Sequence, residues 1–188
     1  MDKKRLIVGV SGSSGAPIAV QVLRALRGSG VESHLILTDG GKCTVQAETG
    51  LTPEQFCALA DRAYDNRDIG AGPASGTWRS CGMLIVPCSM KTLAGIHSGY
   101  SDSLLLRAAD VTLKEARPLV LCPRETPLSP IHLRNLCELS QLGVRIVPPM
   151  LSYYNAPASV DDLTHHIACK LLDCFGIETD GFRRWEGC

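Results

Sequence analysis

The sequence has no excess of charge of either sign. Its 188 residues include 19 lysines and arginines against 19 aspartates and glutamates, so the formal net charge at pH 7 is +0. A balanced chain lacks the extended positive field that holds a nucleic-acid backbone or an anionic membrane. We therefore expect no nucleic acid and no membrane among its partners, and any anion site must be local.

Long hydrophobic runs are also missing. The leading MDKKR is followed by an apolar run of about six residues, which is too short for a signal peptide or a membrane span. We expect a cytoplasmic protein. A chain of 188 residues suits one domain with a real core rather than two. We predict a single domain over 1–188, with a C-terminal tail from about residue 176.

Metal-binding patterns are missing as well. The nine cysteines are an odd number without a CxxC pair or a Cys/His spacing that suits zinc. They are predicted to be reduced, buried small hydrophobic side chains. No DDxxD pattern is present to hold magnesium on a diphosphate, and Cys88 has no evident histidine partner in the neighbouring sequence. We expect no metal.

What the sequence does have is an alternation of short β-branched runs with longer segments of helical periodicity. This alternation is typical of a parallel sheet covered by helices on both faces. The predicted strands are 5–10, 34–38, 82–87, 119–122 and 144–147. The predicted helices are 17–27, 41–49, 101–116, 131–142 and 160–175. Small residues and a proline predict an ordered loop over 66–80.

A glycine-rich turn, GVSGSSGAP at 9–17, follows the first predicted strand. Its N–H groups and serine hydroxyls can bind a phosphate at the start of a helix. The turn lacks the third glycine of a dinucleotide fingerprint and the lysine of a P-loop, and a tight turn without a ligand is the alternative. In a doubly wound sheet, ligands bind outside the carboxyl ends of the strands, so the residues after the other strands are candidates too.

Those other strand ends carry hydroxyls and charges. Thr38 ends the second strand, and the segment 87–92 offers two hydroxyls, a lysine and several N–H groups, as a binding site or an ordinary helix cap. Arg124 and Glu125 stand side by side after the fourth strand, as site residues or a surface ion pair. A proline-stiffened loop with two tyrosines follows the fifth.

A candidate second anion site lies in the predicted helix 101–116. Arg107 and Lys114 are seven residues apart, about two helical turns, so both lie on one face. A solvated cationic face explains this spacing equally well. His165 and His166 fall in the last predicted helix, where a partly buried or surface role is expected rather than catalysis.

Motifs from nearly the whole chain, residues 5–185, resemble the flavin prenyltransferase family of the UbiX type, whose members are also described as components of hydroxyarylic or phenylacrylic acid decarboxylases. The long central run, which contains RAADVTLKEARPLVLCPRETPL, is the most specific. The motifs are GVSGSSGAP, PASGTW, PCSMKTLAGI, LLLRAADVTLKEARPLVLCPRETPLSPIHLRNL, IVPPMLSYYNAP and FRRW.

The resemblance implies a flavodoxin-like or Rossmann-like three-layer α/β fold that binds FMN and dimethylallyl phosphate without a metal. Members of the family join the dimethylallyl group to N5 and C6 of reduced FMN. The prenylated FMN then serves a UbiD-type aromatic acid decarboxylase. Members assemble as homo-dodecamers with sites at subunit contacts, so Arg107 and Lys114 are expected to reach a neighbour's site.

The motifs also carry residue roles. The resemblance implies FMN contacts from Gly12, Ser13, Ser14, Thr38, Ser89, Met90, Lys91, Thr92 and Arg124. It implies contacts to the substrate phosphate from Ser75, Arg107, Lys114, Tyr154 and Lys170. Position 170 is lysine where many members have arginine, which keeps the charge but removes the bidentate fork.

Glu48 and Glu125 match the acidic residues to which the family assigns proton transfer. Breaking an allylic C–O bond leaves a cation and a phosphate, so cations and a proton donor are needed at the phosphate. We assign Glu125 to that proton and Glu48, acting with Ser14, to removal of the ring proton from C6. Trp78 and the flavin are expected to face the allylic cation.

Two other functions are weighed against this one. A flavin-dependent cysteine decarboxylase has a related fold, but its PASANT-like motif and early catalytic histidine are not found here; PASGTW is a superficial echo. The second alternative is a non-catalytic accessory subunit that binds FMN. Its role would not need the substrate-phosphate cluster around Arg107 and Lys114.

Overall fold

The computed structural model describes residues 4–187 and contains, within that range, one six-stranded sheet. The strand order is β3-β2-β1-β4-β5-β6, and every neighbouring pair is parallel. The prediction of a mainly parallel sheet is confirmed. The strands are β1 Lys4–Val10, β2 Val31–Leu37, β3 Arg62–Asp65, β4 Gly82–Cys88, β5 Leu119–Pro123 and β6 Arg145–Ile146.

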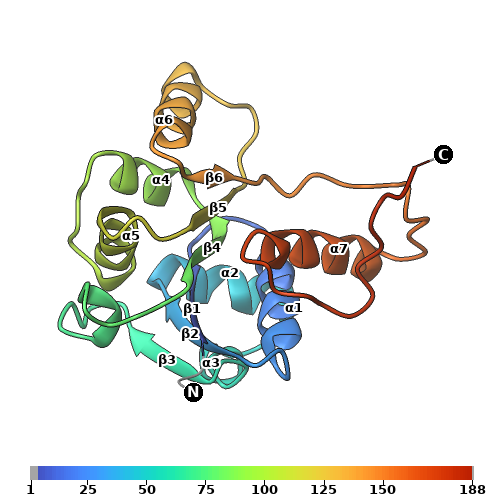
Figure 1. Ribbon diagram of the computed structural model, residues 1–188, viewed down its shortest axis with the longest axis horizontal. Helices are drawn as coiled ribbons and strands as arrows, with labels where there is room; N and C mark the ends of the chain where they lie inside the picture. The colour runs from blue at the N-terminus through green and yellow to red at the C-terminus, as the bar shows by residue number, and fades with distance from the viewer. Residues whose placement is uncertain (1–3, 188) are drawn as a thin grey trace.

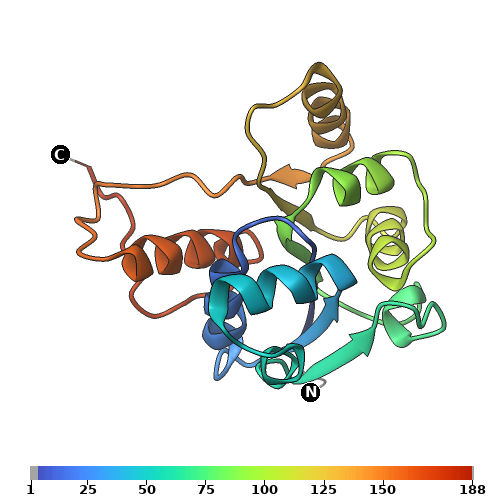
Figure 2. The ribbon, with the colours of Figure 1, turned by 180° about the vertical axis from the view of Figure 1, so that it is seen from behind.

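Helices cover both faces of this sheet, which gives the three-layer architecture (Figure 1). One face carries α1 Ala16–Leu26, α2 Asp39–Thr49, α3 Pro53–Cys57 and α7 Val160–Asp173. The other carries α4 Met90–His97, α5 Leu104–Lys114 and α6 Pro130–Gln141. The view from behind shows α1 and α2 together on the first face (Figure 2).

The apolar runs of the central strands explain this layering. β4 is buried at all seven positions, and β1 is buried from Leu6 to Val10. Alternate side chains of such strands point to opposite faces. Leu6 and Val8 therefore join the core under α1 and α7, whereas Ile7 joins the core under α4 and α5. Two separate apolar cores thus fix which helix lies on which face.

The structure differs from the sequence-based prediction at the edges of the elements. The edge strand β3 was not predicted, because its RAYD sequence is mostly exposed and has no apolar run. β2 begins at Val31 rather than His34, since the polar Glu32 and Ser33 still pair with β1. The helices α3 and α4 are additional. The segment 66–80 is a loop as predicted, with one short 3-10 turn at Gly72–Ala74.

The prediction that the cysteines are buried is wrong for most of them. All eight described cysteines are free, but only Cys88, Cys122 and Cys169 are buried, while Cys43 and Cys137 are exposed. The exposed ones lie on the outer faces of α2 and α6, where periodicity alone does not distinguish a cysteine from a polar residue.

Gly41, in the first turn of α2, allows that helix to touch β1. A Cβ at this position would lie 2.6 Å from Val10 O and 2.8 Å from Leu37 Cδ1. Because a backbone carbonyl cannot move aside cheaply, we expect Gly41→Ala to lower the free energy of unfolding by about 2–3 kcal/mol. Urea unfolding checks this, with Gly70→Ala as the control: its added Cβ would meet only Asp68 Oδ1 at 3.4 Å. Equal midpoints for the two variants would contradict the prediction.

Candidate active site

Ser11, directly after β1, ties together two turns at the carboxyl ends of neighbouring strands. Its hydroxyl donates to Pro87 O at 3.0 Å and accepts from the N–H of Ser89 at 2.7 Å. Ser11 is 1% exposed, so water does not compete strongly for these bonds. The turns after β1 and β4 are therefore held in a fixed relation.

Hydroxyl groups cap the two helices that begin beside these turns. Thr38 is the N-cap of α2, and its Oγ1 accepts from the N–H of Gly41 at 3.0 Å. Ser89 is the N-cap of α4, and its Oγ accepts from the N–H of Thr92 at 3.3 Å. Both helices thus direct the partial positive charge of their N-termini toward the strand ends, where an anion binds favourably.

A cavity of about 860 Å³ opens between these helix starts and α5. Five of the residues that were predicted to bind the cofactor line this cavity: Gly12, Thr38, Ser89, Lys91 and Thr92. Met90 is the first residue of α4 and packs against the core beneath, so its side chain does not line the cavity.

Ser13 provides the test of whether this edge of the sheet suits a phosphate. Its Oγ is buried and has no hydrogen-bond partner among residues 4–187. A buried hydroxyl left unpaired costs about 1–3 kcal/mol, and a phosphate oxygen is the acceptor that would satisfy it. Together with the helix N-termini, the residues present fit FMN, with its phosphate near the turn after β1.

We expect Ser13→Ala to separate binding from stability. Removal of an unpaired buried hydroxyl leaves the FMN-free protein as stable as the wild type or slightly more stable. Loss of a hydrogen bond to a charged phosphate weakens FMN binding by roughly tenfold or more. Fluorescence titration with FMN and thermal unfolding of the FMN-free protein measure the two quantities. Unchanged FMN affinity would show that Ser13 does not contact the cofactor.

Glu48, near the end of α2, reaches the start of α1 from another part of the chain. Its Oε2 accepts from the N–H groups of Gly15 at 2.8 Å and Ala16 at 2.9 Å. The Ser14 hydroxyl is a further hydrogen-bond partner. Gly15 provides no side-chain cap for α1, so the carboxylate of Glu48 takes that role.

The protonation of Glu48 follows from this setting. Partial burial raises the pKa of its carboxyl, but hydrogen bonds from Ser14, Gly15 and Ala16 and the charge of Arg124 outweigh that effect. The pKa of Glu48 therefore lies below its usual value. At neutral pH the group is an ionised carboxylate, which is the form that a general base requires.

A second cavity, of about 580 Å³, lies between α1 and α7 beside Glu48. Ser14, Glu48 and Arg124 form its polar end. Its other walls are mostly apolar and come from α1, α7 and the loop after β6; they are Pro17, Ile18, Pro149, Leu151, Val160, Leu163 and Ile167. The turn after β1 borders both cavities, because Gly12 lines the first and Ser14 lines the second.

Glu125 follows Arg124 at the end of β5 and is exposed. Its Oε1 accepts only from the N–H of its neighbour Thr126, at 3.0 Å, among the hydrogen bonds described for residues 4–187. The ion pair with Arg124 that the sequence left open is not formed within the described residues. The Glu48 carboxylate is thus held at the N-terminus of α1, whereas the Glu125 carboxylate lies at the surface.

Tyr154 and Lys170, both predicted to hold the substrate phosphate, line one cavity of about 460 Å³. Ile167 lines this cavity and also the one beside Glu48, so the two are adjacent. The Lys170 ammonium lies 3.3 Å from Asp173. The ring of Tyr154 packs edge-on against Trp185 of the C-terminal tail, with 5.6 Å between ring centroids.

His166 is a member of this group that the sequence analysis did not assign. It is 7% exposed, and its Nε2 lies 3.2 Å from the Tyr154 hydroxyl. Burial, then the charges of His165 and Lys170, lower the pKa of His166, so the imidazole is neutral at pH 7. Its spacing of four residues from Lys170 on one helix was the signal that could have found it.

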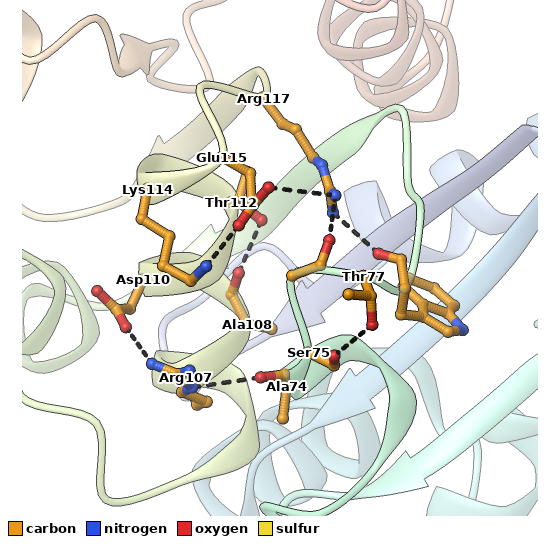
Figure 3. Close-up of polar contacts among 12 residues, drawn as sticks. Ala74, Ser75, Thr77, Arg107, Ala108, Asp110, Thr112, Lys114, Glu115 and Arg117 are labelled. Atoms are coloured by element: carbon orange, nitrogen blue, oxygen red, sulfur yellow. Dashed lines mark hydrogen bonds and ion pairs between the residues drawn. The ribbon is translucent and has the colours of Figure 1, made fainter.

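The other predicted phosphate residues lie on α5 and the loop before β4 (Figure 3). Arg107 Nε donates to Ala74 O at 3.3 Å, and its Nη1 pairs with Asp110 at 2.6 Å. Lys114 pairs with Glu115 at 2.5 Å. Ser75 is exposed, and its Oγ lies 3.0 Å from Thr77 Oγ1.

Trp78 lies in the loop before β4 and lines none of the three cavities described above. Its ring packs edge-on against His34, with 4.8 Å between centroids, and the Arg5 guanidinium lies 5.2 Å from the ring centre. Within one chain, its role is therefore packing. A place beside the allylic group would require a neighbouring chain.

A single chain thus separates the predicted phosphate residues into two groups. Tyr154 and Lys170 belong to the face of α1 and α7, whereas Arg107 and Lys114 belong to the face of α5 (Figure 1). The six-stranded sheet lies between them. Both groups can meet one phosphate only if they come from different copies of the chain.

Two further classes of feature are missing from the part of the chain that the structure describes. Among residues 4–187, no group of three or more His, Cys, Asp or Glu side chains is arranged to hold a metal ion. None of the helices in this range has the length and apolar character needed to cross a membrane.

Comparison with known proteins defines the class. A family model described as Flavoprotein matches residues 1–172, so this protein is a flavoprotein. This agrees with the turns after β1 and β4, which are suited to bind a phosphate. A relative from Streptomyces sp. (strain D7), named a probable UbiX-like flavin prenyltransferase, is 52% identical over 184 residues, covering 97% of this chain and 92% of the relative. The chain belongs to the UbiX-like flavin prenyltransferase family, and the resemblance of the motifs is confirmed.

Two solved structures are similar over nearly their whole length. A dodecameric FMN-dependent UbiX-like decarboxylase from Escherichia coli O157:H7 has a TM-score of 0.95 and 50% identity, covering 97% of this chain and 100% of that one. AnUbiX (PadA1), in complex with FMN and dimethylallyl pyrophosphate, has a TM-score of 0.97 and 44% identity, with 100% of both chains covered. The predicted flavodoxin-like fold is confirmed.

Proposed function

We propose that this protein joins the dimethylallyl group of dimethylallyl phosphate to N5 and C6 of reduced FMN, without a metal, and releases prenylated FMN. The observation that carries the proposal is the cavity of about 580 Å³ between α1 and α7. Its apolar walls suit a five-carbon allylic group. Its polar end supplies the carboxylate of Glu48, the Ser14 hydroxyl and the Arg124 cation.

FMN, when bound, supplies an electron-rich ring that accepts the allylic carbon. The chain's own residues do the rest. The turn after β1 and the N-termini of α2 and α4 hold the FMN phosphate. The cations Lys170, Arg107 and Lys114, together with the hydroxyls of Tyr154 and Ser75, hold the substrate phosphate and stabilise its charge as the C–O bond breaks.

Two carboxyl groups handle the protons. Glu125 protonates the departing phosphate, which its exposed position after β5 permits. Glu48 removes the C6 proton when the carbon–carbon bond at C6 forms. The setting of Glu48 supports its part in this division, since its N–H donors keep it ionised, as a base requires.

The complete site is proposed to form between chains of a homo-dodecamer, as the separation of Tyr154 and Lys170 from Arg107 and Lys114 requires. A dodecameric assembly is recorded for the similar Escherichia coli protein. The product is proposed to serve a UbiD-type aromatic acid decarboxylase. Such a recipient would take the modified flavin as its own cofactor.

Anaerobic incubation with reduced FMN and dimethylallyl phosphate tests the function. The flavin extracted afterwards should show a mass gain of one five-carbon unit. A parallel incubation with dimethylallyl pyrophosphate determines which phosphate is accepted. Unchanged flavin with carbon dioxide release from a cysteinyl peptide would instead identify a cysteine decarboxylase, and unchanged flavin with neither reaction would leave the accessory flavin-binding role.

A further inference from the structure

The loop that carries Ser75 is held against α5 by an arginine outside the predicted phosphate set. Arg117 follows α5, and its guanidinium donates to two carbonyls of the loop, to Gly76 O at 2.6 Å and to Trp78 O at 2.9 Å. Figure 3 shows both bonds converging on one side chain. The side chain of Arg117 is 17% exposed, so its charge is directed inward and is not offered to a ligand.

A hydrogen bond from a second arginine holds the other end of the same loop. Arg107, one of the predicted phosphate residues, donates its Nε to Ala74 O at 3.3 Å. The carbonyls on both sides of Ser75 are therefore turned toward α5. The Ser75 side chain is exposed, with its Oγ beside Thr77 Oγ1 at 3.0 Å, and is therefore accessible from outside the chain.

Arg117 is also linked to Lys114 through Glu115. Glu115 Oε1 accepts from Lys114 Nζ at 2.5 Å, while its Oε2 lies 3.9 Å from Arg117 Nη2. These charges lie over Gly76. A Cβ added at Gly76 would overlap Glu115 Oε1 and lie 2.9 Å from Lys114 Nζ. The loop and the Lys114 ammonium are therefore placed by one set of contacts.

We propose that Arg117 is a positioning residue for the substrate phosphate: it fixes the Ser75 loop and, through Glu115, the ammonium of Lys114 on the surface that a neighbouring chain's site meets. The inference rests on the proposed function, because it concerns the phosphate that this reaction releases. Arg117 itself does not touch the substrate. Its planar fork is needed since one side chain must reach two carbonyls at once.

Arg117→Lys tests the proposal, since it keeps the charge and loses the fork. We expect the KM for dimethylallyl phosphate to rise about tenfold with kcat within about twofold of the wild type. FMN affinity and the mass of the assembly should stay unchanged, because Arg117 lines neither cavity at the strand ends. Hydrogen exchange should become faster at residues 74–78.

Arg27→Lys is the matched control. Arg27 also donates to two carbonyls, to Ala58 O at 2.7 Å and Leu59 O at 3.2 Å, but it lies at the end of α1, on the face of the sheet opposite to α5. Its replacement should leave KM and kcat at wild-type values. An equal rise of KM in both variants would overturn the specific role of Arg117.

Gly76→Ala provides an independent test should Arg117→Lys fail to assemble. The added Cβ meets only the ends of flexible side chains, so stability should hardly change while Lys114 and Glu115 are displaced. We expect a higher KM with kcat retained. Wild-type kinetics in this variant would overturn the proposal.

A failure of the proposed function can be told apart from a failure of this inference. Wild-type protein that makes no prenylated flavin would refute the function. The positioning role is then decided by hydrogen exchange at 74–78 and by calorimetric binding of inorganic phosphate to the assembled protein. Faster exchange with weaker phosphate binding in Arg117→Lys supports the role, and wild-type values of both refute it.

Discussion

Glu48→Ala is expected to yield a flavin that carries the five-carbon group at N5 but keeps its C6 proton. Glu48 is the carboxylate that lines the cavity with Ser14, and its removal takes away the proposed base for that proton. Loss of a general base lowers the rate of the dependent step by roughly 10²–10⁴-fold. NMR of the extracted flavin, after denaturation under anaerobic conditions, reports the C6 proton directly. A completed fourth ring in this variant would refute the assignment of Glu48.

Glu48→Gln separates the chemical role from the structural one. Its amide oxygen can still accept from the N–H groups of Gly15 and Ala16, as the Glu48 carboxylate does, but an amide is not a base at neutral pH. Both variants should stop before ring closure. Only Glu48→Ala should also lose stability, by about 1 kcal/mol, because α1 then lacks its N-terminal acceptor.

Lys114→Met and Lys170→Met are each expected to lower kcat/KM for dimethylallyl phosphate by roughly 10²–10³-fold, because each removes a cation that holds the phosphate both in the bound substrate and as it departs. Co-expressed in equal amounts, the two variants should recover activity. The two lysines lie on opposite faces of the sheet, so the proposed site would draw them from different chains. In a randomly mixed symmetric assembly, about a quarter of the sites hold both intact lysines.

The control for this experiment is co-expression of Arg107→Met with Lys114→Met. Both residues lie on α5 beside the same loop, so one chain must supply both to a site. No chain of that mixture has both, and activity should stay at the level of the single variants. Recovery in the control, or none in the Lys114 and Lys170 mixture, would contradict a site shared between chains.

The edge of the sheet at which the candidate cofactor residues gather could be predicted from sequence because it depends on local patterns. In parallel strands all carboxyl ends meet at one edge, so Gly12, Thr38 and Ser89 had to come close once their strands were recognised. Glu48 could not be placed in that way. Its position at the start of α1 depends on how α2 packs, and periodicity contains no such information; only the resemblance of the motifs pointed to it.

The roles of histidines and arginines were the hardest to predict. His166 pairs with Tyr154 because a long loop returns to α7 after β6. Arg117 holds the Ser75 loop because the end of α5 passes beside it. Side-chain partners that are distant in sequence are set by packing, so the sequence indicated at most that His166 shares a helix face with Lys170 and did not indicate its pairing with Tyr154.

The amino-acid sequence by itself determined the alternating strands and helices, the parallel sheet and the edge at which the candidate FMN-binding residues gather, because apolar periodicity and turn chemistry are local properties. The tertiary structure decided which charged groups share a site. It anchored Glu48 to the N-terminus of α1, brought Lys170 beside Tyr154, and left Arg107 and Lys114 on the opposite face. The physical reason is that a sheet buried on both sides divides one chain's helices into two separate surfaces.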